Sequence, residues 1–184
     1  MTVVVLFAVA IVVAAGAALV RRHLAADSAK SDGAVLATDV IATVVTLALL
    51  VLALIPVTRD GHWDGGWLVA IQVLAVVAAA VTGASAVRLV LAAGGIPTRG
   101  NNHDDEPDAP LRGGRIIGML ERTAVVVSLL LAWPAGIGVA LAVKSLARFS
   151  ELRAPRASEQ FILGTFASVL WAAAFAGVAY LAGI

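Results

Sequence analysis

The sequence predicts an all-α fold, a polytopic transmembrane helical bundle that forms a single domain over residues 1–184 and crosses the membrane six times. Composition is the first reason, because 61% of the residues are hydrophobic and 14% are charged, whereas soluble domains average about 45–50% and about 25%. The second reason is that several apolar stretches approach the ~20 residues that cross a bilayer. The third is the segregation of lysine and arginine toward one side, which orients such spans.

The first half of the chain, residues 1–95, contains three expected spans, at residues 2–20, 34–56 and 67–93. The glycines and proline of Gly94–Pro97 end the third span, since both residue types break helices. The first span has no basic residue before its apolar core, and that core is longer than in a signal peptide. We therefore expect a retained span that enters from outside, with a cleaved signal peptide as the alternative.

An acidic inner loop at residues 98–114 separates the two halves. Its acidic residues are Asp104, Asp105, Glu106 and Asp108. Carboxylates attract divalent cations, but this spacing is not that of a known metal-binding loop, so a solvated acidic stretch is the preferred interpretation. The chain has no cysteine, and its histidines lack the paired spacing of metal motifs. We expect no metal and no cofactor.

The second half, residues 115–184, contains the long uncharged run Thr123–Val143, with Trp133 and Pro134 at its middle. If the run were one span, Lys144 and the cations after it would lie across the membrane from those before it, against the positive-inside tendency. A helical hairpin that turns at Trp133 and Pro134 returns all of these cations to one side. We predict the hairpin, with helices at 115–132, 135–149 and 159–183. A five-span chain with a kink at Pro134 is the alternative.

This topology places both termini outside and twelve of the 13 lysines and arginines on or toward the inner side, with Arg59 as the exception. The aromatic residues expected near the outer interface are Trp63, Trp67, Trp133 and Tyr180. Amphipathic rings prefer that level of the bilayer, and only Trp171 among the tryptophans does not fit. We therefore expect a multi-pass protein of the cell (plasma) membrane with both termini extracytoplasmic.

Ionisable residues within the expected helices form a predicted charged intramembrane cluster. Its members are Asp39, Arg88, Glu121, Arg122, Lys144, Arg148 and Glu159. In a hairpin centred on Trp133, Glu121 and Lys144 are almost equally far from the turn, so the two charges meet at one level. A pair is far cheaper to bury than either charge alone.

Two interpretations of this cluster remain open. In the first, the charges lie at the membrane–water interface and have a structural role only. The cations extend toward water, and the ion pair of Glu121 with Lys144 holds the two helices of the hairpin together. In the second, they form a site for an ion, a proton or an anionic head group, since charges inside a membrane are functional candidates. Asp39 is the best single candidate because no cation adjoins it in the sequence. Its alternative role is a pair with Arg88 or Arg122 that serves folding.

The favoured function is a component of a membrane transport or ion-translocating system, working as a homo-oligomer or beside a larger membrane subunit. The alternative is a non-catalytic accessory or assembly protein, whose basic inner face binds a partner subunit or anionic lipid. An enzyme acting on lipids has least support, because the sequence contains no catalytic or nucleotide-binding motif. Nucleic-acid binding has no support.

Three segments of the second half carry a resemblance: Gly114–Arg122 (GRIIGMLER), Lys144–Phe149 (KSLARF) and Phe161–Thr165 (FILGT). With them the chain resembles a group of small bacterial polytopic membrane proteins of uncharacterised function. The resemblance implies that the charged hairpin and the start of the last helix are the core of that group.

The first half is similar to the small three-span subunits of multisubunit cation/proton antiporters, in which a basic loop leads into a second helix that bears an aspartate. Arg21, Arg22, Asp32 and Asp39 take those positions here. The Gly-Pro usual after the basic residues is missing, and Gly33 follows Asp32 where those subunits have arginine. This similarity implies a role in ion translocation.

Overall fold

The computed structural model describes residues 1–26, 32–59, 63–96, 114–149 and 155–184. All regular secondary structure in these ranges is helical, which confirms the predicted all-α class. The helices are α1 (Thr2–Ala26), α2 (Asp32–Arg59), α3 (Gly65–Ala93), α4 (Gly114–Leu130), α5 (Ala135–Ala147) and α6 (Pro155–Leu181). The predicted acidic loop, residues 98–114, lies outside the described residues except for its last residue, which begins α4.

Within the ranges that the structure describes, four helices are long and apolar enough to cross a membrane: α1, α2, α3 and α6, over residues 2–24, 33–59, 65–93 and 157–181. The chain therefore has the helices of an integral membrane protein. The other two are shorter, with 17 residues in α4 and 13 in α5. At 1.5 Å per residue they measure about 26 and about 20 Å, less than the ~30 Å hydrocarbon core of a bilayer.

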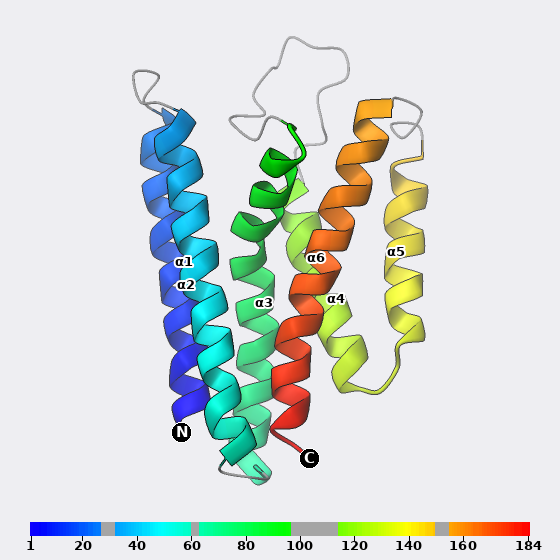
Figure 1. Cartoon of the computed structure of the whole chain (residues 1–184). Coiled ribbons are helices and arrows are strands. Elements are labelled where there is room, and N and C mark those ends of the chain that lie inside the picture. Colours follow the sequence, from blue (N-terminus) through cyan, green and yellow to red (C-terminus); the bar gives the residue numbers. More distant parts are fainter. Residues whose placement is uncertain (27–31, 60–62, 97–113, 150–154) are drawn as a thin grey trace.

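The helices run up and down, so that both termini lie at one end of the bundle (Figure 1). We call this the terminal end, and we call the opposite end, where α1, α3 and α5 finish and α2, α4 and α6 begin, the charged end. At the terminal end, the backbone N–H of Trp63 donates to the carbonyl of Ala182 at 2.9 Å and links the start of α3 to the end of α6.

Helix α3 lies at the centre and packs against α1, α2, α4 and α6. Its buried residues include Ala75, Ala78, Ala79 and Ala86, and such small side chains let helices in a membrane approach closely. Larger side chains fill the remaining space, since Phe7 of α1 and Phe175 of α6 are fully buried with ring centroids 5.5 Å apart. The small side chains of α3 thus allow its four neighbouring helices to approach it closely.

The run Thr123–Val143 is divided between α4 and α5, which lie antiparallel (Figure 1). The N–H of Trp133 donates to the carbonyl of Ser128 at 2.8 Å and that of Ala132 donates to Leu129 at 3.1 Å, the two bonds of a Schellman helix end. Ala132 takes the left-handed conformation of that motif, with φ 53°. Pro134 follows as the N-cap residue of α5, and its ring already holds a helical φ of −63°.

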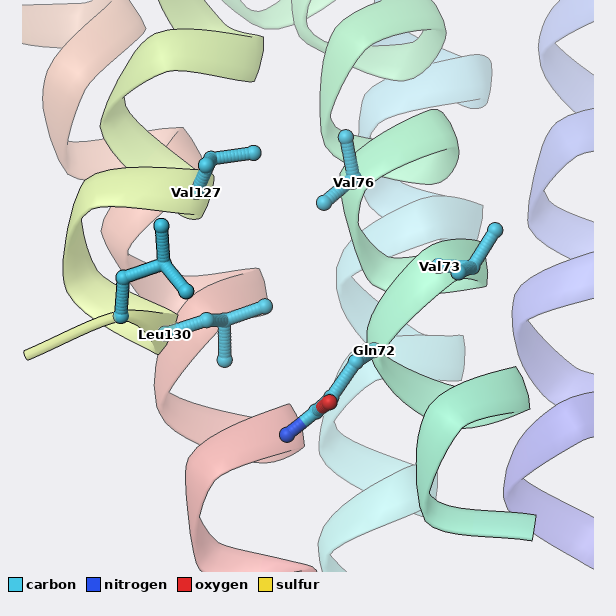
Figure 2. Close-up of a pocket in the computed structure, with 6 residues that line it drawn as sticks. Gln72, Val73, Val76, Val127 and Leu130 are labelled. Carbon is cyan, nitrogen blue, oxygen red and sulfur yellow. The ribbon is translucent and has the colours of Figure 1, made fainter. Parts of the chain in front are cut away.

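The turn between α4 and α5 stops short of the terminal end. Leu130 and Leu131 line the same groove as Gln72 (Figure 2), which lies seven residues after the first residue of α3. Seven helical residues span roughly 10 Å. Among the described helices, α5 packs along α4 and also reaches α6 through the Lys144 side chain, so it lies at the edge of the bundle.

Candidate functional site

Asp39 lies two turns inside α2 at the charged end and is 3% exposed. Arg88 of α3 binds both of its carboxylate oxygens, with Nη2 2.6 Å from Oδ1 and Nε 3.0 Å from Oδ2. Arg21 of α1 adds a third contact, Nη1 to Oδ2 at 2.9 Å. One carboxylate thereby ties three helices together through a two-bond arginine fork, the strongest geometry for such a pair.

Arg88 is one of the two partners that the sequence suggested for Asp39, whereas Arg21 was missed. The sequence interpretation ended the first helix at residue 20 and assigned Arg21 to a loop. In the structure α1 continues to Ala26, which places Arg21 on the helix and beside α2. The available signal was the absence of any glycine or proline between residues 20 and 26.

A second ionic contact joins α4, α5 and α6. Lys144 of α5 forms an ion pair with Glu121 of α4, donates to Thr165 Oγ1 of α6 at 2.8 Å, and lies 5.1 Å from the ring centroid of Phe161. The three N–H groups of the ammonium thus face two oxygen acceptors and an aromatic ring. Glu121 is 6% exposed, and its second oxygen, Oε1, is buried with no hydrogen-bond partner.

The contact of Glu121 with Lys144 is the one that their distances from Trp133 predicted. Thr165 and Phe161 were not predicted as members of the site. Both lie in the segment Phe161–Thr165, four residues apart, which places them on the same side of α6. The sequence does not mark these two residues as part of the site, because a threonine and a phenylalanine in an apolar helix carry no sign of their partners.

Arg122, beside Glu121, makes a different kind of contact. It is 3% exposed, and its Nε and Nη2 donate to the backbone carbonyl of Ala80 at 3.1 and 2.7 Å. Gly83 provides the space, because a Cβ at that position would lie 2.5 Å from Arg122 Cδ and 2.9 Å from Trp171 Cδ1. Trp171 is held in turn by its hydrogen bond to Thr82 Oγ1 at 2.9 Å. The hydrogen bonds of Arg122 therefore connect α4 to the middle of α3.

Two predicted residues remain, Arg148 and Glu159. Arg148 is the C-cap residue of α5 and is partly exposed. Glu159 of α6 is exposed and makes no hydrogen bond or ion pair with a residue that the structure describes. The seven predicted residues thus include two ionic pairs, Asp39 with Arg88 and Glu121 with Lys144. Arg122 instead donates hydrogen bonds to a backbone carbonyl.

In addition to these charges, a groove lies between α3 and α4 (Figure 2). It has a volume of about 180 Å³, and its lining residues are Gln72, Val73, Val76, Val127, Leu130 and Leu131. The groove lies toward the terminal end and holds one polar side chain, Gln72. Among the described residues no group of three or more metal-ligating side chains comes together.

No protein-family description, curated protein or solved structure matches this chain. The two resemblances given above therefore stay predictions, and function has to be argued from the site.

Proposed function

We propose that this membrane protein is a component of an ion-translocating system and that the pair of Glu121 and Lys144 takes up and releases the translocated ion. The observation that carries the proposal is Glu121 Oε1, a buried carboxylate oxygen without a hydrogen-bond donor. Leaving such a group unsatisfied is costly in an apolar interior. A group retained at that cost inside a membrane is a candidate for function.

The chemistry around Glu121 favours a proton as the ion. Metal cations such as Ca²⁺ and Mg²⁺ require about six or more oxygen ligands, whereas the described partners of this site are the Lys144 ammonium, the Thr165 hydroxyl and the Phe161 ring. The ammonium also repels a second cation. A proton needs only one lone pair, and Oε1 offers it.

The exchange proposed at this pair is a simple acid–base step. A proton that reaches Oε1 forms a new O–H bond and converts the carboxylate of Glu121 to a neutral acid, which weakens its attraction for Lys144. The ammonium keeps its contacts with Thr165 and Phe161. Release of the same proton from Oε1 restores the ion pair, so no other reactant is consumed.

We place the charged end at the inner membrane face. Nine lysines and arginines lie in the described residues, and Arg59 alone among them lies at the terminal end. The positive-inside tendency then puts both termini outside the cell membrane. In this topology α4 and α5 form a hairpin that begins and ends at the inner face, and a local thinning of the bilayer accommodates their short length.

Cysteine labelling tests the topology, because the chain has no cysteine of its own. Single cysteines replace Ala135 at the turn and Gly114 at the start of α4, both exposed positions, and an impermeant thiol reagent is added to intact cells. We expect labelling at position 135 and none at position 114. Labelling at position 114 alone would mean that the charged end lies at the outer membrane face. Labelling at both positions would mean that the start of α4 does not lie at the inner face.

Proton flux into vesicles tests the function. The full chain is reconstituted with a pH-sensitive dye inside, and a potassium diffusion potential drives proton entry. We expect flux from the wild type and at least a tenfold loss in Glu121→Gln. Glu159→Gln is the matched control, since it removes a carboxylate at the same end that makes no described contact, and it should retain the flux. A wild type without flux, or a Glu121→Gln variant as active as the wild type, would refute the proposal.

The accessory role remains the second candidate, and the position of α5 favours it. Helix α5 packs along α4 and contacts α6 through Lys144, and it leaves Val139, Val143 and Leu146 between 56% and 75% exposed. A partner subunit would cover that side, while the cations of the charged end would contact its acidic groups or anionic lipid. In this role Glu121→Gln lowers the stability of the fold, and vesicles of the wild-type chain alone carry no proton flux.

A further inference from the structure

We infer that Glu121 of α4 and Ser168 of α6 bind a buried water molecule between them, and that this water delivers the proton to Glu121 Oε1. The role of the water rests on the function proposed above, whereas its binding site is defined by the surrounding side chains alone. Ser168 is then a positioning residue, because it acts on the proton through the water.

Ser168 has a buried hydroxyl that lacks a hydrogen-bond partner. It is 3% exposed, and its Oγ bonds to no group that the structure describes. Hydroxyls elsewhere in the bundle donate to a carbonyl of their own helix, as Thr43, Thr82 and Ser85 do at 2.7–2.9 Å, the usual arrangement in apolar helices. Leaving a buried hydroxyl unsatisfied is costly, so a polar group bound in the helix interface would lower the free energy of Ser168.

Ser168 lies beside the pair of Glu121 and Lys144. Helices α4 and α6 pack together and both begin at the charged end (Figure 1). Lys144 contacts both Glu121 and Thr165, which places these two residues at the same level. Ser168 follows Thr165 by three residues, so it lies on the same side of α6 and roughly 4.5 Å further from the charged end.

Trp171 limits the position of Ser168 from the other direction. It follows Ser168 by three residues, and its Cδ1 would lie 2.9 Å from a Cβ at Gly83, while Cδ of Arg122 would lie 2.5 Å from the same Cβ. Arg122 is the neighbour of Glu121 in α4. Ser168 therefore lies between two residues of α6 that meet the contacts of Glu121 on one side and of Arg122 on the other.

A water molecule suits the polar groups that converge here. Glu121 Oε1 accepts a hydrogen bond, the Ser168 hydroxyl donates and accepts one, and the Thr165 hydroxyl retains its hydrogen because it is the acceptor for Lys144. Buried waters typically make about three hydrogen bonds to groups that are otherwise unsatisfied. Two O–H···O bonds of about 2.8 Å join oxygens that lie about 5 Å apart, so the water can bridge facing helices.

The side of α6 that carries Ser168 has room for a small group. Gly164 lies one turn before Ser168 on this side. A Cβ at Gly164 would meet only Val87 Cγ1 outside its own helix, at 3.8 Å, which is an ordinary van der Waals distance. The space next to the unpaired hydroxyl thus accepts a group of about the size of a water molecule.

The water completes the acid–base step at Glu121. A proton that arrives from the charged end forms a bond to the water oxygen, and one of the O–H bonds of the water breaks as its proton passes to Oε1. The water is regenerated, and the reverse sequence releases the proton. The hydroxyl of Ser168 holds the water oxygen within reach of Oε1 throughout.

Infrared difference spectra test the water site without a measurement of flux. Acidification of the full chain protonates Glu121, and a bound water is recognised by an O–H stretching band that shifts in water labelled with heavy oxygen. We expect this band in the wild type and in Ser168→Thr, which keeps the hydroxyl, and its loss in Ser168→Ala and Glu121→Gln. Ser85→Ala is the matched control, because this buried hydroxyl bonds to its own helix, and it should keep the band. A wild type without the band, or a Ser168→Ala variant that retains it, would overturn the inference.

Proton flux into vesicles tests the role of the water. Ser168→Ala should lower the flux about fivefold, the effect of one ordinary hydrogen bond, while Ser168→Thr and Ser85→Ala should stay near the wild type. Full flux in Ser168→Ala beside loss of flux in Glu121→Gln would overturn this inference alone. A wild type without flux would overturn both the proposed function and the delivery of protons by the water, and the infrared spectra would then decide the water site.

Discussion

Gly83→Ala should be one of the most damaging single-methyl substitutions in this protein. The added Cβ would lie 2.5 Å from Cδ and 2.7 Å from Nε of Arg122, and 2.9 Å from Cδ1 of Trp171. These atoms lie in the middle of side chains whose ends are fixed. Arg122 is held by its two hydrogen bonds to Ala80, and Trp171 by its bond to Thr82. Neither side chain can swing away without breaking a hydrogen bond.

The magnitude follows from these contacts. Displacing Arg122 sacrifices charge-assisted hydrogen bonds, worth about 1.5–3 kcal/mol, and crowding a packed interior adds roughly 1–3 kcal/mol. Alanine recovers up to about 1 kcal/mol relative to glycine in a helix. We therefore expect a net loss of about 1.5–5 kcal/mol in the free energy of unfolding, which is roughly a 10- to 4,000-fold shift in the folding equilibrium.

Equilibrium unfolding in mixed detergent micelles, followed by tryptophan fluorescence, measures this loss. Gly16→Ala is the control, because a Cβ at that position in α1 meets nothing within 4 Å. It should leave stability unchanged or raise it by up to about 1 kcal/mol. The reasoning would be wrong if Gly83→Ala behaved like Gly16→Ala, since Arg122 and Trp171 would then not occupy the space above Gly83.

Two further substitutions test other parts of the structure. Ala132→Gly should stabilise the fold by about 0.5–1 kcal/mol in the same unfolding assay, because Ala132 has a φ of 53° that glycine adopts without strain; a loss of stability would contradict the Schellman end of α4. Asp39→Asn should lower the melting temperature in detergent, because it removes the charge that Arg21 and Arg88 share. Breaking a buried pair costs up to about 3–5 kcal/mol, and the 26% exposure of the Arg88 side chain reduces this to roughly half. Unchanged stability and unchanged proton flux in Asp39→Asn would mean that this contact serves neither folding nor function.

The sequence was most informative where the relevant property is a sum over neighbouring residues. Whether a stretch is apolar enough to cross a membrane depends on its own composition, so the class of the fold and the approximate limits of the long helices followed directly. The pairing of Glu121 with Lys144 was accessible for a related reason. In an antiparallel pair of helices, two positions equally far from the turn lie at the same level, and counting along the chain finds them.

Contacts between helices that are far apart in the chain could not be predicted by counting residues from a turn. Arg122 binds a backbone carbonyl, and every residue has such a carbonyl, so nothing in the sequence marks Ala80 as its acceptor. Gly83 is one of 17 glycines, and its importance depends on which side chain approaches it. The environment of Gln72 likewise depends on how closely α4 packs against α3.

The amino-acid sequence alone therefore determined that this chain forms apolar helices long enough to cross a membrane, because partition into a membrane is a local property of each segment. Only the tertiary structure decided that Arg21 joins Asp39, that Lys144 reaches Thr165 of α6 and that Gln72 faces a groove. Those contacts depend on the rotation and relative height of helices, which result from the packing of the whole bundle.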